Sequence, residues 1–367
     1  MKILVSTDKF KGTLSAAEAG EAIARGLRRS NRSTEVRLHP LADGGDGTLE
    51  CFLAGGAARI ECRVHDPLMR PVQASYALLP DGLTACIEMA KASGLVLLRK
   101  EELNPLRTTS LGTGELIRDA ISRGVRHVLL GIGGSATNDG GAGMMAALGA
   151  RFLDKAGDDM FPCGGSLSRM AEVDERNLLP ELQATTFTAL CDVTNPFYGE
   201  HGAARVYAPQ KGASEDDVRV LDAGLQHLAS WILRTKGIDL QRVPGAGAGG
   251  GLAGGAVAWL GAKLRSGIDT VMEQTHYDRA LQWADIVVTG EGKVDSQSVS
   301  GKVVAGVLRR VSQAGKRAII ICGDAEPGIT WPDVPIYSMV SFAGSARSLS
   351  RPAECLEDVA ASVALPG

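Results

Sequence analysis

Short runs of apolar, β-branched residues alternate with amphipathic stretches at both ends of the chain. Residues 3–6 form the first such run, and residues 15–29 then place Ala, Ile and Leu at helical spacing. Ser15, with Glu18 three residues later, is the signature of a capping box at the start of that helix. Three further apolar runs lie near the other end, at residues 286–289, 318–322 and 336–340. Short buried strands that alternate with helices predict a parallel sheet.

The middle of the chain has a different pattern. Residues 59–64, 72–77 and 83–88 read as short alternating segments that prolines and glycines separate. This spacing predicts an antiparallel meander. The stretches that follow predict a helix, a buried strand, a second strand and a long helix, at residues 113–123, 125–132, 187–191 and 214–236. The middle stretch is therefore expected to have a core of its own.

The length of the chain suits two domains rather than one. At about 150 residues per domain, 367 residues exceed a single ordinary core. We predict an α/β protein in which residues 1–60 and 280–367 form a discontinuous Rossmann-like domain with a parallel sheet. Residues 61–279 form a second α/β domain inserted into the first. Two domains imply a cleft between them.

Composition and charge argue against several classes of protein. The chain is 44% apolar and 22% charged, which is ordinary for a globular enzyme. With 39 Lys and Arg against 42 Asp and Glu, the net charge of −3 provides no global positive field for nucleic acid or an anionic membrane. The seven cysteines lack a CxxC pair and the six histidines lack paired spacing, which argues against a disulfide framework and a zinc site. We therefore expect a cytoplasmic protein with reduced thiols and neither signal peptide nor membrane span.

Glycine clusters carry the strongest candidate chemistry. The 46 glycines gather beside Asp, Ser, Thr and Asn, above all at residues 131–143, between an apolar strand and a helical stretch. Backbone N–H groups at such a turn can bind phosphate, helped by the helix N-terminus. Asp139 could hold a metal ion or a ribose hydroxyl, and a tight turn capped by Asn and Asp is the alternative explanation. The candidate nucleotide-binding residues here are Gly133, Gly134, Ser135, Ala136, Thr137 and Asn138.

Acidic residues also follow predicted strands in the first third of the chain. Asp8 comes after the first strand, with Lys11 close behind it. Asp43 comes after a further predicted strand, at residues 35–41, in a glycine-rich turn. Open α/β sheets bind ligands at the carboxyl ends of their strands, so Asp8, Asp43, Gly44 and Gly45 are candidates for substrate binding. Solvated loop charges and ordinary Asp-Gly turns are the alternatives.

The loop after the first strand of the last third repeats this arrangement. Glu291 and Asp295 can coordinate a cation or accept hydrogen bonds, and Lys293 can offset phosphate charge. Gly290 and Gly292 flank Glu291, so the backbone can approach a nucleotide closely.

Two loops of the middle stretch carry further polar groups. Asp192 ends a predicted strand, where an acid can orient a hydroxyl group and accept its proton, and Asn195 lies nearby. A simple Asx turn before Pro196 is the alternative. Lys211 precedes the long helix and could reach a phosphate, whereas an isolated lysine is more often solvated.

Familiar kinase and dinucleotide motifs are absent or weak in the sequence. Gly301 and Lys302 are followed by Val303, so no P-loop motif occurs, and neither an H-R-D loop nor a D-F-G motif is present. Residues 245–250 fit G-x-G-x-x-G, but the residues before them make a poor strand and include Pro244. That match is weak evidence for a dinucleotide, and close backbone packing or substrate binding explains the glycines as well.

Taken in order, these loops resemble the bacterial glycerate kinase family, in the class that usually makes 2-phosphoglycerate. The resemblance runs over residues 1–323 and rests on motifs that keep both order and spacing. They are Asp8 with Phe10 and Lys11, then residues 42–48, 109–117, 131–143, 191–196, 209–212 and 289–302. The resemblance implies a two-domain α/β kinase with its active site between the domains. It also implies ATP and Mg²⁺ as co-substrates and D-glycerate as the acceptor.

The resemblance and the residues together lead to a mechanistic hypothesis. Asp192 would orient the glycerate hydroxyl and accept its proton, while Lys11 and Lys211 meet the carboxylate or the transferred phosphate. The glycine-rich residues 133–138 and 290–292 would hold ATP. The residues expected to bind the substrate are Asp8, Asp43, Gly44, Gly45 and Asn195. Four acids compete for the metal, Asp43, Asp139, Glu291 and Asp295, and Asp139 and Asp295 are our assignments.

Two alternatives to a glycerate kinase stay open at this point. One is a kinase of the same architecture that acts on another small hydroxy acid. The other is a sugar-acid or nucleotide sensor without turnover, which would bind its ligand and release no ADP. A positioned acid at Asp192 favours turnover, because binding alone needs no proton acceptor.

Overall fold

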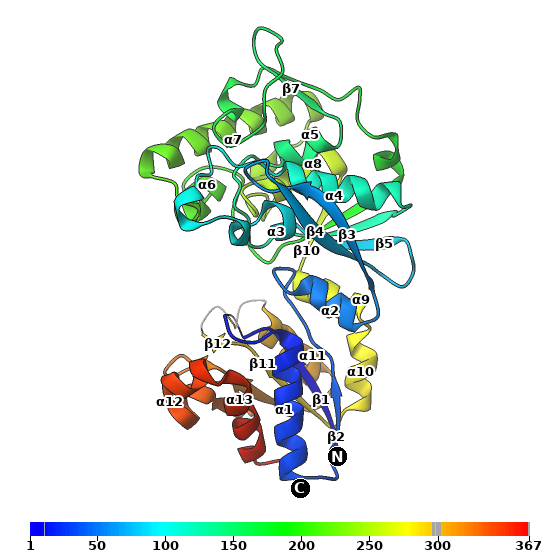
Figure 1. Ribbon diagram of the computed structural model, residues 1–367, viewed down its shortest axis with the longest axis vertical. Helices are drawn as coiled ribbons and strands as arrows, with labels where there is room; N and C mark the ends of the chain where they lie inside the picture. The colour runs from blue at the N-terminus through cyan, green and yellow to red at the C-terminus, as the bar shows by residue number, and fades with distance from the viewer. Residues whose placement is uncertain (11, 296–297, 299–301, 366–367) are drawn as a thin grey trace. The chain divides into compact units, whose positions relative to one another are not determined.

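A computed structural model describes residues 1–10, 12–295, 298 and 302–365 of the chain (Figure 1). Of the residues predicted for the site, Lys11 lies outside the described part. The chain divides into two compact units: unit 1 is Met1–Asp43, Glu50–Gly55 and Ser266–Gly367, and unit 2 is Gly44–Leu49 and Gly56–Arg265. Both units combine helices with a sheet that contains parallel strands, which confirms the predicted α/β fold.

The boundaries between the units differ from those expected at residues 60 and 280. The chain enters unit 2 first at Gly44 and again at Gly56, and it returns to unit 1 at Ser266. The return comes early because helix α9, Gly267–Gln274, packs on other helices of unit 1. The division into domains that fold independently stays a prediction.

The sheet of unit 1 has five strands, and all of its pairs are parallel. Its order is β15-β13-β11-β1-β2, so the first and last thirds of the chain alternate within one sheet. The strands are Lys2–Thr7 (β1), Glu35–Leu38 (β2), Ile286–Gly290 (β11), Arg317–Cys322 (β13) and Ile336–Ser338 (β15). A two-stranded parallel ribbon, β12 (Lys293–Val294) with β14 (Asp324–Ala325), extends from it. The predicted parallel pairing is therefore confirmed. The strands β1, β11 and β13 are buried as predicted, whereas the edge strand β2 is mostly exposed.

The first helix of unit 1 forms where the sequence predicts it. Helix α1 spans Ala16–Ser30, and Ser15 caps it in a capping box with Glu18, as predicted. The other helices of unit 1 are α9, α10 (Tyr277–Trp283), α11 (Val303–Gln313), α12 (Met339–Ser350) and α13 (Pro352–Ser362), and α2 (Thr48–Ala54) begins in the segment assigned to unit 2.

Helix α13 was not predicted, yet it completes the core of unit 1. It lies beside α1, red against blue in Figure 1, and its Leu356 and Val359 are buried. Arg25 pairs with Glu357 over 2.9 Å at the exposed border of the contact. The two helices approach closely because Gly26 of α1 has no side chain there.

We expect Gly26→Ala to lower the free energy of unfolding by about 1–3 kcal/mol, because it overfills this contact. An added Cβ at Gly26 would lie 2.2 Å from the carbonyl oxygen of Glu357, so the helices would have to separate. Gly20→Ala in the same helix is the matched control, since its nearest neighbour is Leu38 Cδ2 at 3.6 Å. The control should gain about 0.5–1 kcal/mol from helix propensity. Urea unfolding measures both, and equal losses would contradict the close approach.

The sheet of unit 2 has six strands in the order β10-β9-β6-β5-β4-β3. The first four are parallel and the last two antiparallel, which confirms the predicted meander. The strands are Ala58–His65 (β3), Pro71–Leu78 (β4), Thr84–Glu88 (β5), His127–Gly131 (β6), Thr186–Leu190 (β9) and Lys263–Arg265 (β10). A separate antiparallel pair consists of β7 (Arg151–Leu153) and β8 (Glu172–Asp174).

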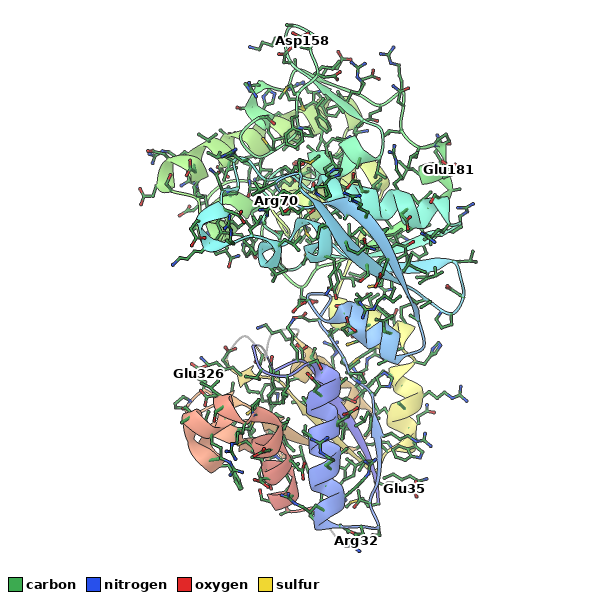
Figure 2. All side chains as sticks on the ribbon, viewed as in Figure 1. Arg32, Glu35, Arg70, Asp158, Glu181 and Glu326 are labelled. Carbon is green, nitrogen blue, oxygen red and sulfur yellow. The ribbon has the colours of Figure 1, made fainter. Side chains whose placement is uncertain are left out.

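Helices cover the sheet of unit 2 and enclose a large apolar core. They are α3 (Ala90–Ser93), α4 (Leu111–Ser122), α5 (Ala142–Ala147), α6 (Ala203–Tyr207), α7 (Glu215–Lys236) and α8 (Leu252–Leu260). The core joins buried residues of the strands, such as Leu130, to helix residues such as Leu225. Charged side chains such as Asp158 and Glu181 lie exposed outside it (Figure 2). None of the helices in the described ranges is long and apolar enough to span a membrane.

Candidate active site

Acidic side chains follow neighbouring strands of unit 1. Asp8 follows β1, Asp43 follows β2 and Glu291 follows β11. The backbone N–H of Asp8 donates to the carbonyl oxygen of Gly290 over 2.9 Å, which joins the loops after β1 and β11. Because all strands of this sheet are parallel, these loops meet at its carboxyl edge.

Asp8 lies in surroundings that disfavour its charge. Its side chain is buried, and burial together with the charge of Asp43 raises the pKa of Asp8 to about 7. The backbone N–H of Lys9 donates to Asp8 Oδ1 over 2.7 Å and acts in the opposite direction. Asp8 can therefore exchange a proton near neutral pH unless a cation holds it ionised.

The surroundings of Glu291 also disfavour the charged form of its side chain. Burial raises its pKa, and the charges of Asp295 and Asp43 add to the effect, whereas Ser298 and Lys302 lower it. Its Oε1 atom is buried and accepts no hydrogen bond from any described residue. A buried carboxylate oxygen of this kind is costly unless a cation or a donor from outside the chain binds it.

These carboxylates fit a Mg²⁺ ion that is shared with a nucleotide. In the described part of the chain, no three His, Cys, Asp or Glu side chains form a metal cage by themselves. Mg²⁺ is usually held by only one or two carboxylates, with phosphate oxygens and water as its other ligands. The orphaned oxygen of Glu291 is the observation that fits such an ion, and Asp295, which acts on Glu291 electrostatically, stays a predicted ligand.

The glycine-rich loop of unit 2 leaves β6 and pairs with a neighbouring segment. Leu95 donates its backbone N–H to the Gly134 carbonyl oxygen, and Ala136 donates to that of Ser93, both over 2.9 Å. Thr108 Oγ1 donates to the Ala136 carbonyl oxygen over 2.8 Å. The loop is thus held through its backbone against residues 93–95.

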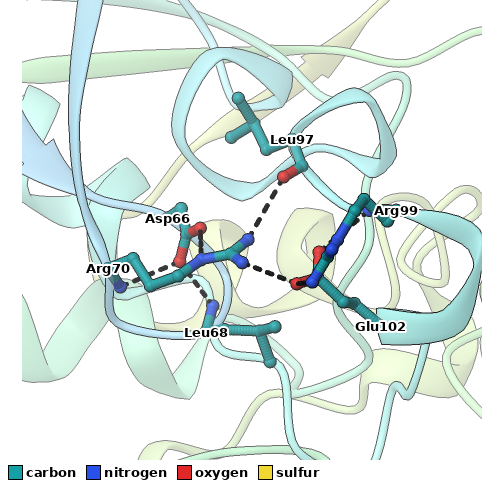
Figure 3. A network of polar contacts seen from close by, with 6 residues as sticks. All are labelled: Asp66, Leu68, Arg70, Leu97, Arg99 and Glu102. Atoms are coloured by element: carbon teal, nitrogen blue, oxygen red, sulfur yellow. Dashed lines mark hydrogen bonds and ion pairs between the residues drawn. The ribbon is translucent and has the colours of Figure 1, made fainter.

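A network of charged side chains braces this neighbouring segment (Figure 3). Arg70, in the turn between β3 and β4, donates from Nε to Asp66 Oδ2 over 2.6 Å and from Nη1 to Glu102 Oε1 over 2.7 Å. Its Nη2 donates to the Leu97 carbonyl oxygen over 3.3 Å, and Arg99 also contacts Glu102. The network ties the turn to the residues next to those that pair with the glycine-rich loop.

Asp139 is an internal anchor of the glycine-rich loop. Its Oδ2 accepts hydrogen bonds from Ser110 N, Ser110 Oγ and Gly143 N, and its Oδ1 accepts one from Gly141 N. The side chain is fully buried, so burial raises its pKa while these bonds oppose the rise. With both oxygens occupied by donors of the chain itself, the arrangement favours a structural role over our assignment of Asp139 to the metal.

The glycines of residues 245–250 serve close backbone packing in this structure. Gly250 has a positive φ of 69°, and an added Cβ would lie 1.9 Å from the Thr137 carbonyl oxygen. Gly140 also donates its N–H to the Gly250 carbonyl oxygen over 3.0 Å. Of the explanations that the sequence left open, the geometry favours packing against the glycine-rich loop.

Lys211 is buried within the loop architecture. Its side chain is 2% exposed, and Nζ donates to Ser135 Oγ and to the Thr137 carbonyl oxygen, each over 2.7 Å. Burial lowers the pKa of Lys211 to about 7, and the charge of Asp139 acts against that change. Lys211 therefore joins two residues of the glycine-rich loop, an interaction that the sequence did not predict.

Two side chains of the same loop have buried polar atoms without hydrogen-bond partners among the described residues. Oδ1 and Nδ2 of Asn138 and Oγ1 of Thr137 are buried and have no hydrogen bond to any described residue. Both residues were predicted to bind the nucleotide. Buried polar atoms without partners are rare in proteins, so these atoms are candidates for contact with a polar ligand or with water.

Asp192 and Asn195 follow strand β9, which is the parallel neighbour of β6. Asp192 is exposed, as a group that meets a substrate would be before binding. The amide of Asn195 donates to the His201 carbonyl oxygen over 2.9 Å and accepts from Tyr207 Oη over 2.6 Å. Asn195 is thus engaged within its own loop, which favours a role in shaping the loop rather than the predicted contact with substrate.

Glu88, the last residue of β5, was not singled out in the sequence. Its Oε1 accepts the backbone N–H groups of Gly47 and Leu49 over 3.1 and 2.7 Å, which holds the segment Gly44–Leu49. The sequence signal that could have identified Glu88 is its position as an acid at the end of a predicted strand.

The residues predicted for the site fall into two groups, one in each unit. Those in unit 1 are Asp8, Asp43, Gly290, Glu291, Gly292 and Asp295. Those in unit 2 are Gly44, Gly45, residues 133–139, Asp192, Asn195 and Lys211.

Comparison with known proteins identifies the family to which the chain belongs. The model of the glycerate kinase family matches residues 3–365. Glycerate 2-kinase from Escherichia coli is 45% identical over 325 residues, which are 88% of this chain and 85% of that protein. Glycerate kinase from Halalkalibacterium halodurans is 44% identical over 327 residues, 89% of this chain and 86% of that protein.

A solved structure extends the similarity to three dimensions. The crystal structure described as glycerate kinase 2 from Salmonella typhimurium LT2 superposes with a TM-score of 0.87 at 40% identity. The similarity covers 98% of this chain and 96% of that one. With the family model matching nearly every residue and relatives at this identity over most of their length, the chain belongs to the glycerate kinase family, whose members are phosphotransferase enzymes.

Proposed function

We propose that the protein transfers the γ-phosphoryl group of ATP to a hydroxyl group of D-glycerate and that the product is 2-phosphoglycerate. Membership of the glycerate kinase family supports the ATP-dependent phosphorylation of glycerate. The choice of product follows the resemblance to the class that makes 2-phosphoglycerate and the similarity to a glycerate 2-kinase.

The glycine-rich loop of unit 2 is the proposed site for the phosphates of ATP. The observation that carries this assignment is the set of buried, unpartnered polar atoms on Thr137 and Asn138. Lys211 joins Ser135 to Thr137 and brings positive charge close to the loop when it is protonated. Phosphoryl transfer needs positioned donors and cations more than covalent chemistry, and these groups provide both.

The acidic loops of unit 1 are the proposed holders of Mg²⁺, with Glu291, Asp295 and Asp43 as the candidate residues. When bound, the ion would neutralise charge on the β- and γ-phosphate oxygens. Without the ion, burial and the nearby charge of Asp43 raise the pKa of both Asp8 and Glu291. Gly290 is buried, and an added Cβ there would lie 1.7 Å from the Ile321 carbonyl oxygen, which favours close packing of β11 against β13 as its role. The partly buried Gly292 stays the candidate for backbone contact with the nucleotide.

Asp192 is the proposed general base. An exposed carboxylate at the carboxyl end of β9 can accept the proton of the glycerate hydroxyl as that oxygen attacks the γ-phosphorus. The bond between the γ-phosphorus and the bridging oxygen breaks, and ADP leaves with that oxygen.

Purified protein should form ADP only when glycerate, ATP and a divalent cation are all present. A coupled assay of ADP release tests this, with the acceptor or the cation omitted as controls. Turnover without glycerate, or the same rate with other small hydroxy acids, would contradict the assignment. Phosphorus NMR of the product then distinguishes 2-phosphoglycerate from 3-phosphoglycerate.

A further inference from the structure

We propose that Glu88 is a positioning residue, which holds the segment Gly44–Leu49 so that Gly44 and Gly45 can bind the acceptor substrate. The identity of that substrate as glycerate rests on the proposed function. The inference that Glu88 holds this segment does not depend on the substrate and is based on the hydrogen bonds of Glu88.

The carboxylate of Glu88 organises the start of helix α2. The side chain is 2% exposed, and its Oε1 accepts both the Gly47 and the Leu49 backbone N–H groups. The first N–H groups of a helix have no partner within the helix, so an oxygen from outside stabilises them. Thr48 Oγ1 closes the same turn by donating to the Gly45 carbonyl oxygen over 2.7 Å.

The segment that Glu88 holds lies directly against the start of the glycine-rich loop. An added Cβ at Gly131 would lie 2.6 Å from the Gly44 carbonyl oxygen, and one at Gly133 would lie 3.0 Å from Gly45 Cα. Backbone meets backbone at both places. A shift of the segment would therefore move Gly44 and Gly45 relative to the loop proposed to hold the phosphates.

The two carboxylate oxygens of Glu88 have different surroundings. Both backbone hydrogen bonds end on Oε1, whereas Oε2 is buried, has no hydrogen bond to the described residues and lies 3.5 Å from Lys91 Nζ. Burial raises the pKa of Glu88, and Lys91 opposes the rise. One neutral amide oxygen could accept the same two bonds, so holding the segment does not require a negative charge.

Steady-state kinetics of Glu88→Ala and Glu88→Gln test the link to the substrate. Misplacement of binding groups by about 1 Å can cost about 100-fold, so Glu88→Ala should raise the KM for glycerate by about 10- to 100-fold. The KM for ATP should stay unchanged. Glu88→Gln should restore the glycerate KM to within a few fold, because its Oε1 can still accept both bonds. Equal loss in the two variants would mean that the charge itself acts, and would overturn the positioning role.

Hydrogen exchange tests the holding of the segment without any assay of activity. In the ligand-free full chain, the amides of Gly47 and Leu49 should exchange faster in Glu88→Ala than in the wild type. Unchanged exchange would overturn the proposal, even if glycerate phosphorylation is confirmed. Faster exchange in a protein that fails to phosphorylate glycerate would instead overturn only the proposed function.

Asp81→Ala is a matched control at the opposite end of β5. Asp81 Oδ1 also accepts two backbone N–H groups, from Leu83 over 2.9 Å and from Thr84 over 2.8 Å. Its removal should lower stability and leave the glycerate KM unchanged. An equal rise in that KM would overturn the role of Glu88, since general destabilisation would explain both.

Gly131→Ala is a second probe, for the case in which Glu88→Ala does not fold. The added methyl group would press on the Gly44 carbonyl oxygen without removing the Glu88 carboxylate. The same rise in the glycerate KM is expected. A rise in the KM for ATP alone would overturn the proposal.

Discussion

Replacing Asp192 with asparagine is expected to lower kcat by about 100- to 10,000-fold, the usual contribution of a general base. Asparagine keeps the shape of the side chain and a hydrogen-bonding group but cannot accept the proton of the glycerate hydroxyl. Asp192 stands exposed after β9, on the strand next to the one that leads into the glycine-rich loop. Affinity for ATP should stay close to that of the wild type, because the loop residues that would hold the phosphates are unchanged.

The measurement is ADP release at saturating glycerate, together with calorimetric titration of a non-hydrolysable ATP analogue. Glu200→Gln is a suitable control, because Glu200 is an exposed carboxylate in the following turn and should tolerate the change. Near-normal turnover of the Asp192 variant would assign Asp192 to a structural turn. A parallel loss of nucleotide binding would point to a misfolded loop.

Replacing Asp8 with asparagine is expected to stabilise unit 1 at pH 8 while it lowers activity. The pKa of Asp8 is raised from 3.8 to about 7, so the folded state binds the proton more tightly than the unfolded state. Between these two values the unfolded chain loses the proton first, and stability falls as pH rises. Below pH 3.8 both states are protonated and there is no penalty, whereas above pH 7 the penalty is complete.

Asparagine resembles the neutral form of Asp8 and removes this penalty. The gain at pH 8 should be at most about 4 kcal/mol, since raising the pKa from 3.8 to about 7 is worth about 1.4 kcal/mol per unit. The gain should vanish near pH 4. Unfolding by urea at both pH values, with a chelator to remove divalent cations, measures the difference. Glu35→Gln, at an exposed position of β2, is the control. A gain that does not depend on pH would contradict burial of an ionised Asp8.

The local elements were predictable because the signals that specify them are local. The apolar runs of β1 and β11, the capping box of Ser15 with Glu18 and the meander from β3 to β5 depend on residues within one short window. Helix α13 was missed, although it packs against α1 at the other end of the chain. That contact depends on Gly26, whose importance becomes visible only when Glu357 lies beside it.

The α/β class and the placement of acidic and glycine-rich loops after the strands were predictable from the residues alone, and the order of these loops indicated the family. The ends of strands and the positions of turns can be predicted from local periodicity and from turn-forming residues, without knowledge of distant contacts. The roles of individual polar side chains became visible only in the folded chain, because each role depends on the partners that folding brings near. Lys211 binds Ser135 across 76 positions, and Asp139 binds Ser110 across 29. Glu88 holds the backbone of Leu49 from 39 positions away. Burial makes such partners decisive, since a polar group removed from water must find its hydrogen bonds within the fold or in a ligand.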